Sequence, residues 1–166
     1  MRMIQIRNLL LLLLTLPLAS CAGGMSDQAR SKVTYFGTFS RLQKEPDKFI
    51  RETVMWGGKV IETHPLQGVT ELIVLQLELT DQDRPRDDDQ SQGRFVARSN
   101  EFLDPAIYPK GTLITVIGRF VEADQRIIGE MRYQYPVIEI DEIKKWPPSG
   151  SQSPRFHFGF GVGTHF

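Results

Sequence analysis

Cysteine is nearly absent from this sequence: Cys21 is the only one among 166 residues. One cysteine cannot form a disulfide within the chain, so the sequence excludes the small secreted domains that disulfides hold together. It also excludes zinc sites built from pairs of cysteines. The single thiol therefore has to serve another purpose, and its place near the N-terminus bears on what that purpose is.

An excess of charge of one sign is also missing. Lys and Arg number 20, as do Asp and Glu, so the formal net charge is zero. Without residues 1–20 the chain keeps 18 basic and 20 acidic residues, a net charge of −2. Proteins that bind the phosphate backbone of nucleic acids carry a strong positive field. We therefore expect no nucleic-acid partner.

Motifs that carry chemistry are scarce. The chain contains three histidines: His64, His157 and His165. None has the His-x-x-x-His spacing of a metal site, and no Gly-x-Ser-x-Gly elbow positions a nucleophilic serine. The acidic run 81–89 contains Arg84 and Arg86, whose charges oppose a cation, and is more typical of a solvated hairpin loop. The sequence therefore predicts no catalytic residue, no metal and no cofactor, and hence a protein that is not an enzyme.

A hydrophobic run long enough to cross a membrane is likewise absent. The apolar stretch 9–16 falls short of the roughly 20 residues that a transmembrane helix needs. Arg2 and Arg7 precede this stretch, and small residues follow it at Ala19 and Ser20. A basic start, a short apolar run and small residues before a cut site make up a signal peptide. We predict that residues 1–20 are a secretion signal.

The residues at the cut site give Cys21 its role. Leu18-Ala19-Ser20-Cys21 resembles the bacterial lipobox, in which the thiol receives a diacylglyceryl group before cleavage. We therefore expect Cys21 to be the lipid-bearing N-terminus of the mature protein. An Asp after this Cys favours retention in the inner membrane, and Ala22 stands there instead, so we expect the outer membrane, facing the periplasm. Residues 21–34 begin with small and polar side chains, which favours a flexible tether.

Strand signals dominate residues 35–146. The segment 54–62 is rich in β-formers around the pair Gly57-Gly58, which indicates a bulge or a sharp coil where other residues resist the backbone conformation. Apolar residues alternate from Ile73 to Leu79, as in a half-buried strand whose inward side chains include Ile73. Further strand signals lie at 93–99, 113–120, 127–130 and 135–143, with a turn at 123–126.

Two short helical turns accompany the strands. Ser40 is a candidate cap for a turn over 41–45, and Asp104-Pro105 favours a turn between strands three and four. About five strands, with glycines placed to coil the sheet, predict an all-β fold, a small Greek-key barrel of the OB type. An open β-sandwich is the alternative architecture.

Several short segments occur in a fixed order: Trp56-Gly57-Gly58-Lys59-Val60, Gly93-Arg94-Phe95, Phe102-Leu103-Asp104-Pro105, Val116-Ile117-Gly118-Arg119, Ile128-Gly129-Glu130, Tyr135-Pro136-Val137-Ile138 and Trp146. In this order and spacing they resemble the Slp family of starvation-inducible outer-membrane lipoproteins of Gram-negative bacteria. The resemblance runs from about Phe36 to Trp146 and includes the signal and lipobox. It implies an outer-membrane lipoprotein with an OB-like body, linked to stationary-phase or stress physiology, and it implies no catalytic residues.

Two features suggest what such a protein contacts. OB barrels bind oligonucleotides and oligosaccharides on one face, so a small-ligand or glycan-binding face around Trp56 and Tyr135 is the alternative to protein contacts. Residues 147–166 form a Pro/Gly-rich tail in which Phe156, Phe158 and Phe160 alternate with small or polar residues. This alternation is a candidate for strand addition to the chain's own sheet or to an envelope protein partner, whereas a Gly-rich disordered tail is the simpler interpretation.

Overall fold

The computed structural model describes residues 23–88 and 90–148. In chain order the elements are α2 (Asp27–Arg30), α3 (Phe39–Lys44), η1 (Pro46–Lys48), β1 (Thr53–Pro65), β2 (Thr70–Leu77), β3 (Arg94–Ser99), β4 (Leu113–Ile128) and β5 (Met131–Lys145). The expected signal peptide, the lipidation site Cys21 and the tail from residue 149 onward lie outside the described residues. Within the described part, no helix has the length and apolar character needed to cross a membrane.

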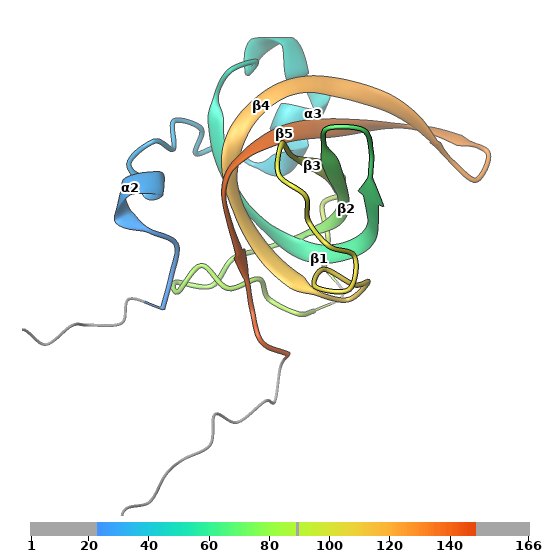
Figure 1. Cartoon of the computed structure of the whole chain (residues 1–166). Coiled ribbons are helices and arrows are strands. Elements are labelled where there is room, and N and C mark those ends of the chain that lie inside the picture. Colours follow the sequence, from blue (N-terminus) through green and yellow to red (C-terminus); the bar gives the residue numbers. More distant parts are fainter. Residues whose placement is uncertain (1–22, 89, 149–166) are drawn as a thin grey trace, which may run out of the picture.

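The five strands form a closed barrel in the order β1-β2-β3-β5-β4, with β4 pairing back to β1 (Figure 1). The pair β3–β5 is parallel, and the other four pairs are antiparallel. A five-stranded closed barrel with this crossover is the Greek-key architecture of the OB fold. The prediction of an all-β OB-like barrel is confirmed, and the open sandwich is excluded.

The barrel interior is filled by side chains that point inward from every strand, and α3 closes one end. Phe39 of α3 lies 4.8 Å from the Trp56 ring and 6.4 Å from the Phe95 ring, centroid to centroid. The helix begins at Thr38, whose hydroxyl accepts a hydrogen bond from Arg41 N at 3.3 Å. The prediction that Ser40 is the cap is therefore wrong, because Ser40 lies inside the helix.

The glycine pair in β1 serves close packing between strands. Neither Gly57 nor Gly58 has a positive φ, and the bulge in β1 lies between Val60 and Glu62. A Cβ on Gly58 would collide with the carbonyl oxygen of Leu75 on the neighbouring strand. The expectation of a bulge and of a restricted conformation at this pair is wrong. Glycine is required there because β2 approaches too closely for a side chain.

The inward face of β2 also differs from the expected one. Leu72 and Val74 lie in the interior cluster, whereas Ile73 lies in a separate cluster on the outside of the barrel. Every residue of β2 except Leu75 is buried, so the strand is covered on both faces. Apolar alternation predicted the wrong phase because the outer face of β2 is covered by another part of the chain.

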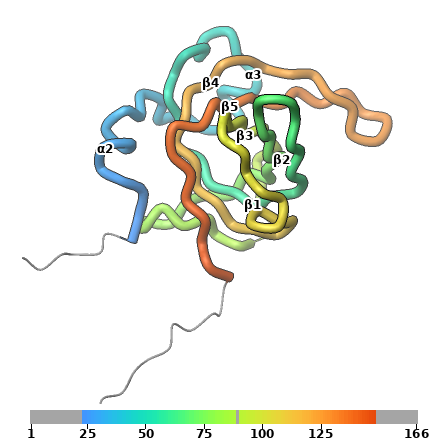
Figure 2. The backbone as a smooth tube through the Cα atoms, in the orientation of Figure 1, coloured from blue at the N-terminus to red at the C-terminus, as the bar shows by residue number. Residues whose placement is uncertain are grey.

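That cover comes from the last two strands. The expected turn at 123–126 is absent, and β4 continues to Ile128 before the chain reverses at Gly129, which has φ +60°. The distal parts of β4 and β5 form the β4–β5 arm, residues 122–137, which extends beyond the barrel (Figure 2).

The expected helical turn at 104–108 is reduced to one hydrogen-bonded turn. Asp104 Oδ1 accepts from Ala106 N at 2.8 Å, and the Asp104 carbonyl accepts from Tyr108 N at 3.0 Å. No helix is formed there. Pro109 follows directly and cannot donate the next helical hydrogen bond, which ends the turn.

Residues 23–34 form the N-terminal strap, which packs on the outside of the barrel. Met25 and Ala29 are buried against Ile117 of β4, and Ser26 caps α2 by accepting from Ala29 N at 3.1 Å. Over these residues the structure therefore shows a packed segment where the sequence predicted a flexible tether. Its small and polar residues are present, but Met25 provides an apolar contact that holds the segment to the barrel.

Candidate functional site

The outer face of β2 and β3 meets the β4–β5 arm in an apolar cluster. Ile73, Val96, Tyr135 and Val137 are buried in this cluster, and Ile128 near the tip of the arm packs against them. Tyr135 also contacts Tyr133 edge-on, with 4.8 Å between ring centroids. The arm is therefore held along the barrel by apolar contacts, and its base is part of a packed surface.

A buried carboxylate fixes the same arm by charge. Glu71 of β2 accepts hydrogen bonds from Arg98 Nε at 3.1 Å and Nη2 at 3.0 Å, and from Arg126 Nη2 at 2.7 Å. Arg126 Nε also donates to Asp124 at 2.8 Å, and Arg98 Nη1 donates to Glu122 at 2.9 Å. Burial lowers the pKa of Arg98, but the hydrogen bonds that Arg98 donates to Glu122 and Glu71, together with their negative charges, outweigh it and raise the pKa above its ordinary value. Since every charge in this network has a partner, burying Glu71 is tolerated.

A cavity of about 300 Å³ opens between the arm and the barrel. We call it the cleft, and its lining residues are Glu62, His64, Ile73, Arg94, Arg126, Ile127, Ile128, Gly129 and Tyr135. His64 Nε2 lies 2.8 Å from Glu62 Oε2, so these two groups satisfy each other.

Arg94 is the chemically available group of the cleft. Its backbone N donates to the Tyr133 hydroxyl at 2.7 Å, which fixes the start of β3. Its guanidinium has no hydrogen bond or ion pair with any residue that the structure describes. A free guanidinium beside Ile73 and Tyr135 suits an anionic group attached to an apolar or aromatic body.

The two ligand-binding residues predicted from the sequence are not brought together. Tyr135 lines the cleft, but Trp56 lies in the barrel interior with 7% of its surface exposed, in tilted contact with Phe39 and edge-on contact with Phe95. No binding face shared by Trp56 and Tyr135 is formed. Sequence reasoning missed Glu71 and Arg94, although a glutamate inside the apolar segment 70–77 was a signal that a buried charge needs a partner.

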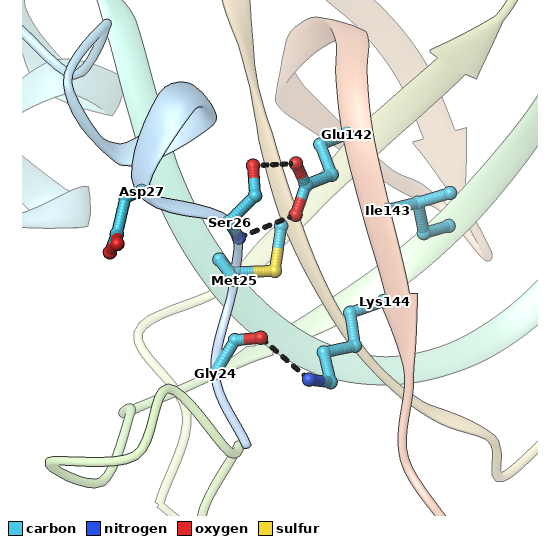
Figure 3. A pocket seen from close by; sticks show the side chains of 7 residues that line it. All are labelled: Gly24, Met25, Ser26, Asp27, Glu142, Ile143 and Lys144. Atoms are coloured by element: carbon cyan, nitrogen blue, oxygen red, sulfur yellow. Dashed lines mark hydrogen bonds between the residues drawn. The ribbon is translucent and has the colours of Figure 1, made fainter. Parts of the chain in front are cut away.

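The N-terminal strap is bound to the barrel by a second set of polar contacts (Figure 3). Ser26 N donates to Glu142 Oε1 at 2.9 Å, and the Ser26 hydroxyl donates to the other oxygen of the same carboxylate. These hydrogen bonds lower the pKa of Glu142. Lys144 Nζ donates to the carbonyl oxygens of Gly23 at 2.7 Å and Gly24 at 2.6 Å. The chain that follows the expected lipid position is therefore bound to β5.

The acidic loop after β2 takes part in the same contact. Asp83 is buried, accepts a hydrogen bond from Met25 N at 2.8 Å and pairs with Arg30. The expectation of a solvated loop is thus wrong at Asp83, because the strap covers it. Across the described residues, no three His, Cys, Asp or Glu side chains gather as metal ligands would.

Comparison with known proteins places this architecture in a family. The model of the outer membrane lipoprotein Slp family matches residues 18–161. The lipoprotein YeaY of Escherichia coli (strain K12) is 32% identical over 106 residues, which cover 64% of this chain and 54% of that protein. The outer membrane protein Slp of the same organism is 24% identical over 141 residues, which cover 84% of this chain and 74% of that protein.

Another relative, a protein of Haemophilus influenzae, is 33% identical over 96 residues, covering 57% of this chain and 52% of that one. The chain thus spans about half the length of YeaY and of this protein. Among solved structures, a small single-stranded DNA-binding protein from Streptomyces coelicolor aligns with a TM-score of 0.38 and 13% identity, over 57% of this chain and 94% of that chain. The family model covers most of the chain, and the chain belongs to the outer membrane lipoprotein Slp family.

Proposed function

We propose that this lipoprotein is a non-enzymatic binding protein of the cell envelope. A lipid on Cys21 holds it in the outer membrane, the barrel lies on the periplasmic side, and the cleft takes a protein segment or a small ligand. The lipobox at 18–21 and the names of the relatives support the anchor. The resemblance to starvation-inducible lipoproteins extends the proposal to stationary-phase or stress physiology.

The observation that carries the binding role is the free guanidinium of Arg94 in the cleft. A partly buried cation without a partner is costly unless a ligand supplies the anion. The apolar wall beside it, formed by Ile73 and Ile128, supplies burial for the rest of that ligand. We therefore propose a partner that offers a carboxylate or a similar anion next to an apolar group, such as an acidic peptide segment or an acidic sugar.

The proposal is tested by crosslinking in intact cells. Wild-type protein is compared with Arg94→Gln, which removes the free cation, and with Arg132→Gln, an exposed arginine of the arm that does not line the cleft. We expect crosslinked adducts in the wild type and in Arg132→Gln, and their loss in Arg94→Gln. Equal adducts in all three proteins would show that the cleft is not the binding site.

A ligand too small to give an adduct is sought in the same variants. Amide NMR spectra of the purified protein are recorded while an envelope extract or acidic sugars are added. Shifts confined to β2, β3 and the arm, and absent from Arg94→Gln, support the ligand-binding form of the proposal. Shifts that persist in Arg94→Gln contradict it.

A further inference from the structure

We propose that one end of the barrel rests on the phospholipid leaflet that holds the lipid of Cys21, so that the cleft and the arm face away from the membrane. This inference rests on the proposed lipidation. We call this surface the anchor end: it consists of Gly23, residues 83–87 of the loop after β2, the turn 106–112 and Trp146–Pro148. Four observations support it: the reach of the chain, the fixing of the strap, the chemistry of the surface and the placement of the arm.

The first observation is the distance between lipid and barrel. Cys21 precedes Gly23 by two residues. An extended chain spans about 3.3–3.6 Å per residue, so the lipid attachment lies within about 7 Å of Gly23. Lys144 holds the Gly23 carbonyl on β5 at 2.7 Å. A lipid buried in the leaflet therefore brings this part of the barrel to the headgroup region.

The second observation is that the strap is fixed at several points. Glu142 accepts a hydrogen bond from the backbone amide of Ser26 (Figure 3). Asp83 accepts one from the backbone amide of Met25 and pairs with Arg30. Met25 is buried against Ile117 as well. A segment held by these contacts cannot swing freely, so the barrel keeps one orientation relative to its lipid.

The third observation is the chemistry of the anchor end. Lys144 Nζ, which binds Gly23, lies 4.7 Å from the Trp146 ring centroid, so the strap and Trp146 are neighbours. Next to Trp146 a groove of about 900 Å³ carries the half-exposed Ile107, with Lys110 and Lys145 exposed on its lining. Asp87 also lines this groove, and its charge is paired with Lys59. A tryptophan, an exposed apolar side chain and lysines together suit the interface of a bilayer with anionic headgroups.

The fourth observation is the placement of the arm. In Figure 1, the strap with α2 and the C-terminal end of β5 lie at the left and bottom of the barrel, whereas the β4–β5 arm projects at the upper right. With the anchor end on the leaflet, the cleft is open to partners within the periplasm.

The test uses the full lipidated chain in vesicles of phosphatidylethanolamine and phosphatidylglycerol that carry spin labels on the headgroups. The protein has two tryptophans, Trp146 at the anchor end and Trp56 inside the barrel. We expect the spin labels to quench the tryptophan fluorescence of the wild-type protein. The variant Trp146→Phe, which retains only Trp56, should lose that quenching. Lys110→Glu should weaken the quenching, and the matched control Lys44→Glu on α3 should leave it unchanged.

The outcomes separate this inference from the proposed lipidation. Protein that fails to float with the vesicles contradicts the lipid anchor. Protein that floats without quenching of Trp146, or with equal quenching in Trp146→Phe, overturns the orientation and leaves the anchor intact. As a second measurement, Asp83→Asn combined with Glu142→Gln should release the strap and reduce the quenching, whereas Glu101→Gln, an exposed carboxylate of the β3–β4 loop, should not.

Discussion

Arg126 on the β4–β5 arm donates a hydrogen bond of 2.7 Å to Glu71 on β2, across the base of the cleft. The Glu71 side chain is almost completely buried, and the arginine is partly exposed. The contact therefore joins the protruding arm to the barrel through a carboxylate that is shielded from water and shared with Arg98 of β3. Removal of the Glu71 carboxylate should therefore weaken the contact between the arm and the barrel before it affects the barrel itself.

We expect Glu71→Gln to destabilise the protein by about 2–3 kcal/mol, somewhat less than for a fully buried ion pair, because Arg98 and Arg126 keep access to water. Chemical denaturation measures the change. The control is Glu139→Gln, whose partner Arg119 is more exposed, and it should leave the midpoint nearly unchanged. Equal effects of the two substitutions would contradict the role of the buried network.

Gly58→Ala should destabilise the barrel by about 1–3 kcal/mol, because the new methyl group overlaps a backbone carbonyl that cannot move aside. Thermal unfolding of the purified domain measures this loss of stability. Gly68→Asn is the matched control: that glycine has a positive φ, which Asn tolerates, and open space around its Cβ position. If Gly58→Ala were harmless, the close approach of β1 and β2 would not be a constraint.

Acidification should release the strap. Because Ser26 lowers the folded-state pKa of Glu142, this contact is fully present above the ordinary glutamate pKa and is lost as the pH falls through the lowered folded value. The amide proton of Ser26 reports it by NMR. We expect its shift to titrate with a midpoint below the usual glutamate range, and Glu142→Gln to abolish the titration. A midpoint at or above the ordinary value contradicts the contact.

Lipidation at Cys21 is a simple chemical prediction. Radiolabelled palmitate should enter the wild-type protein and should be absent from Cys21→Ser, since serine cannot form the thioether. The substituted protein should also leave the membrane fraction. Label in both proteins would place the lipid elsewhere.

Deletion of residues 150–166 should leave the melting temperature of the barrel nearly unchanged, because β5 ends at Lys145 and the barrel is closed without the tail. If the tail adds a strand to an envelope partner, the deletion should also weaken capture of that partner from crosslinked membranes. Unfolding of the deleted form would show that the tail belongs to the core.

The sequence predicted the barrel well because strand signals are local. Phe95 and Ala97 alternate in phase and do lie in the interior. The inward phase of β2 was wrong because Ile73 is as apolar as Leu72, and only the arm, which is distant in sequence, decides which one faces outward.

The candidate site was harder to predict, since it depends on contacts between distant segments. Residues 22–29 have the composition of a linker, and Met25 holds the strap only because the side chain of Ile117 points to the outside of the barrel, where Met25 and Ala29 bury it. Trp56 and Tyr135 are both aromatic residues of strands, and their alternation could not show that one faces the interior and the other the arm. Nothing in the sequence distinguished Arg94 from other arginines, because its role depends on a guanidinium without a partner among the described residues, which only the structure shows.

The parallel pairing of β3 with β5 has a consequence for how the chain folds. Among the strands that the structure describes, β5 is the last to be synthesised, yet it contributes pairs on both of its sides, Val96 with Val137 and Val116 with Ile143. The ring therefore stays open until the C-terminal strand is available, and contacts so distant in sequence form slowly. Late closure suits the predicted secretion signal at residues 1–20, because a chain that crosses a translocation channel has to do so before it folds.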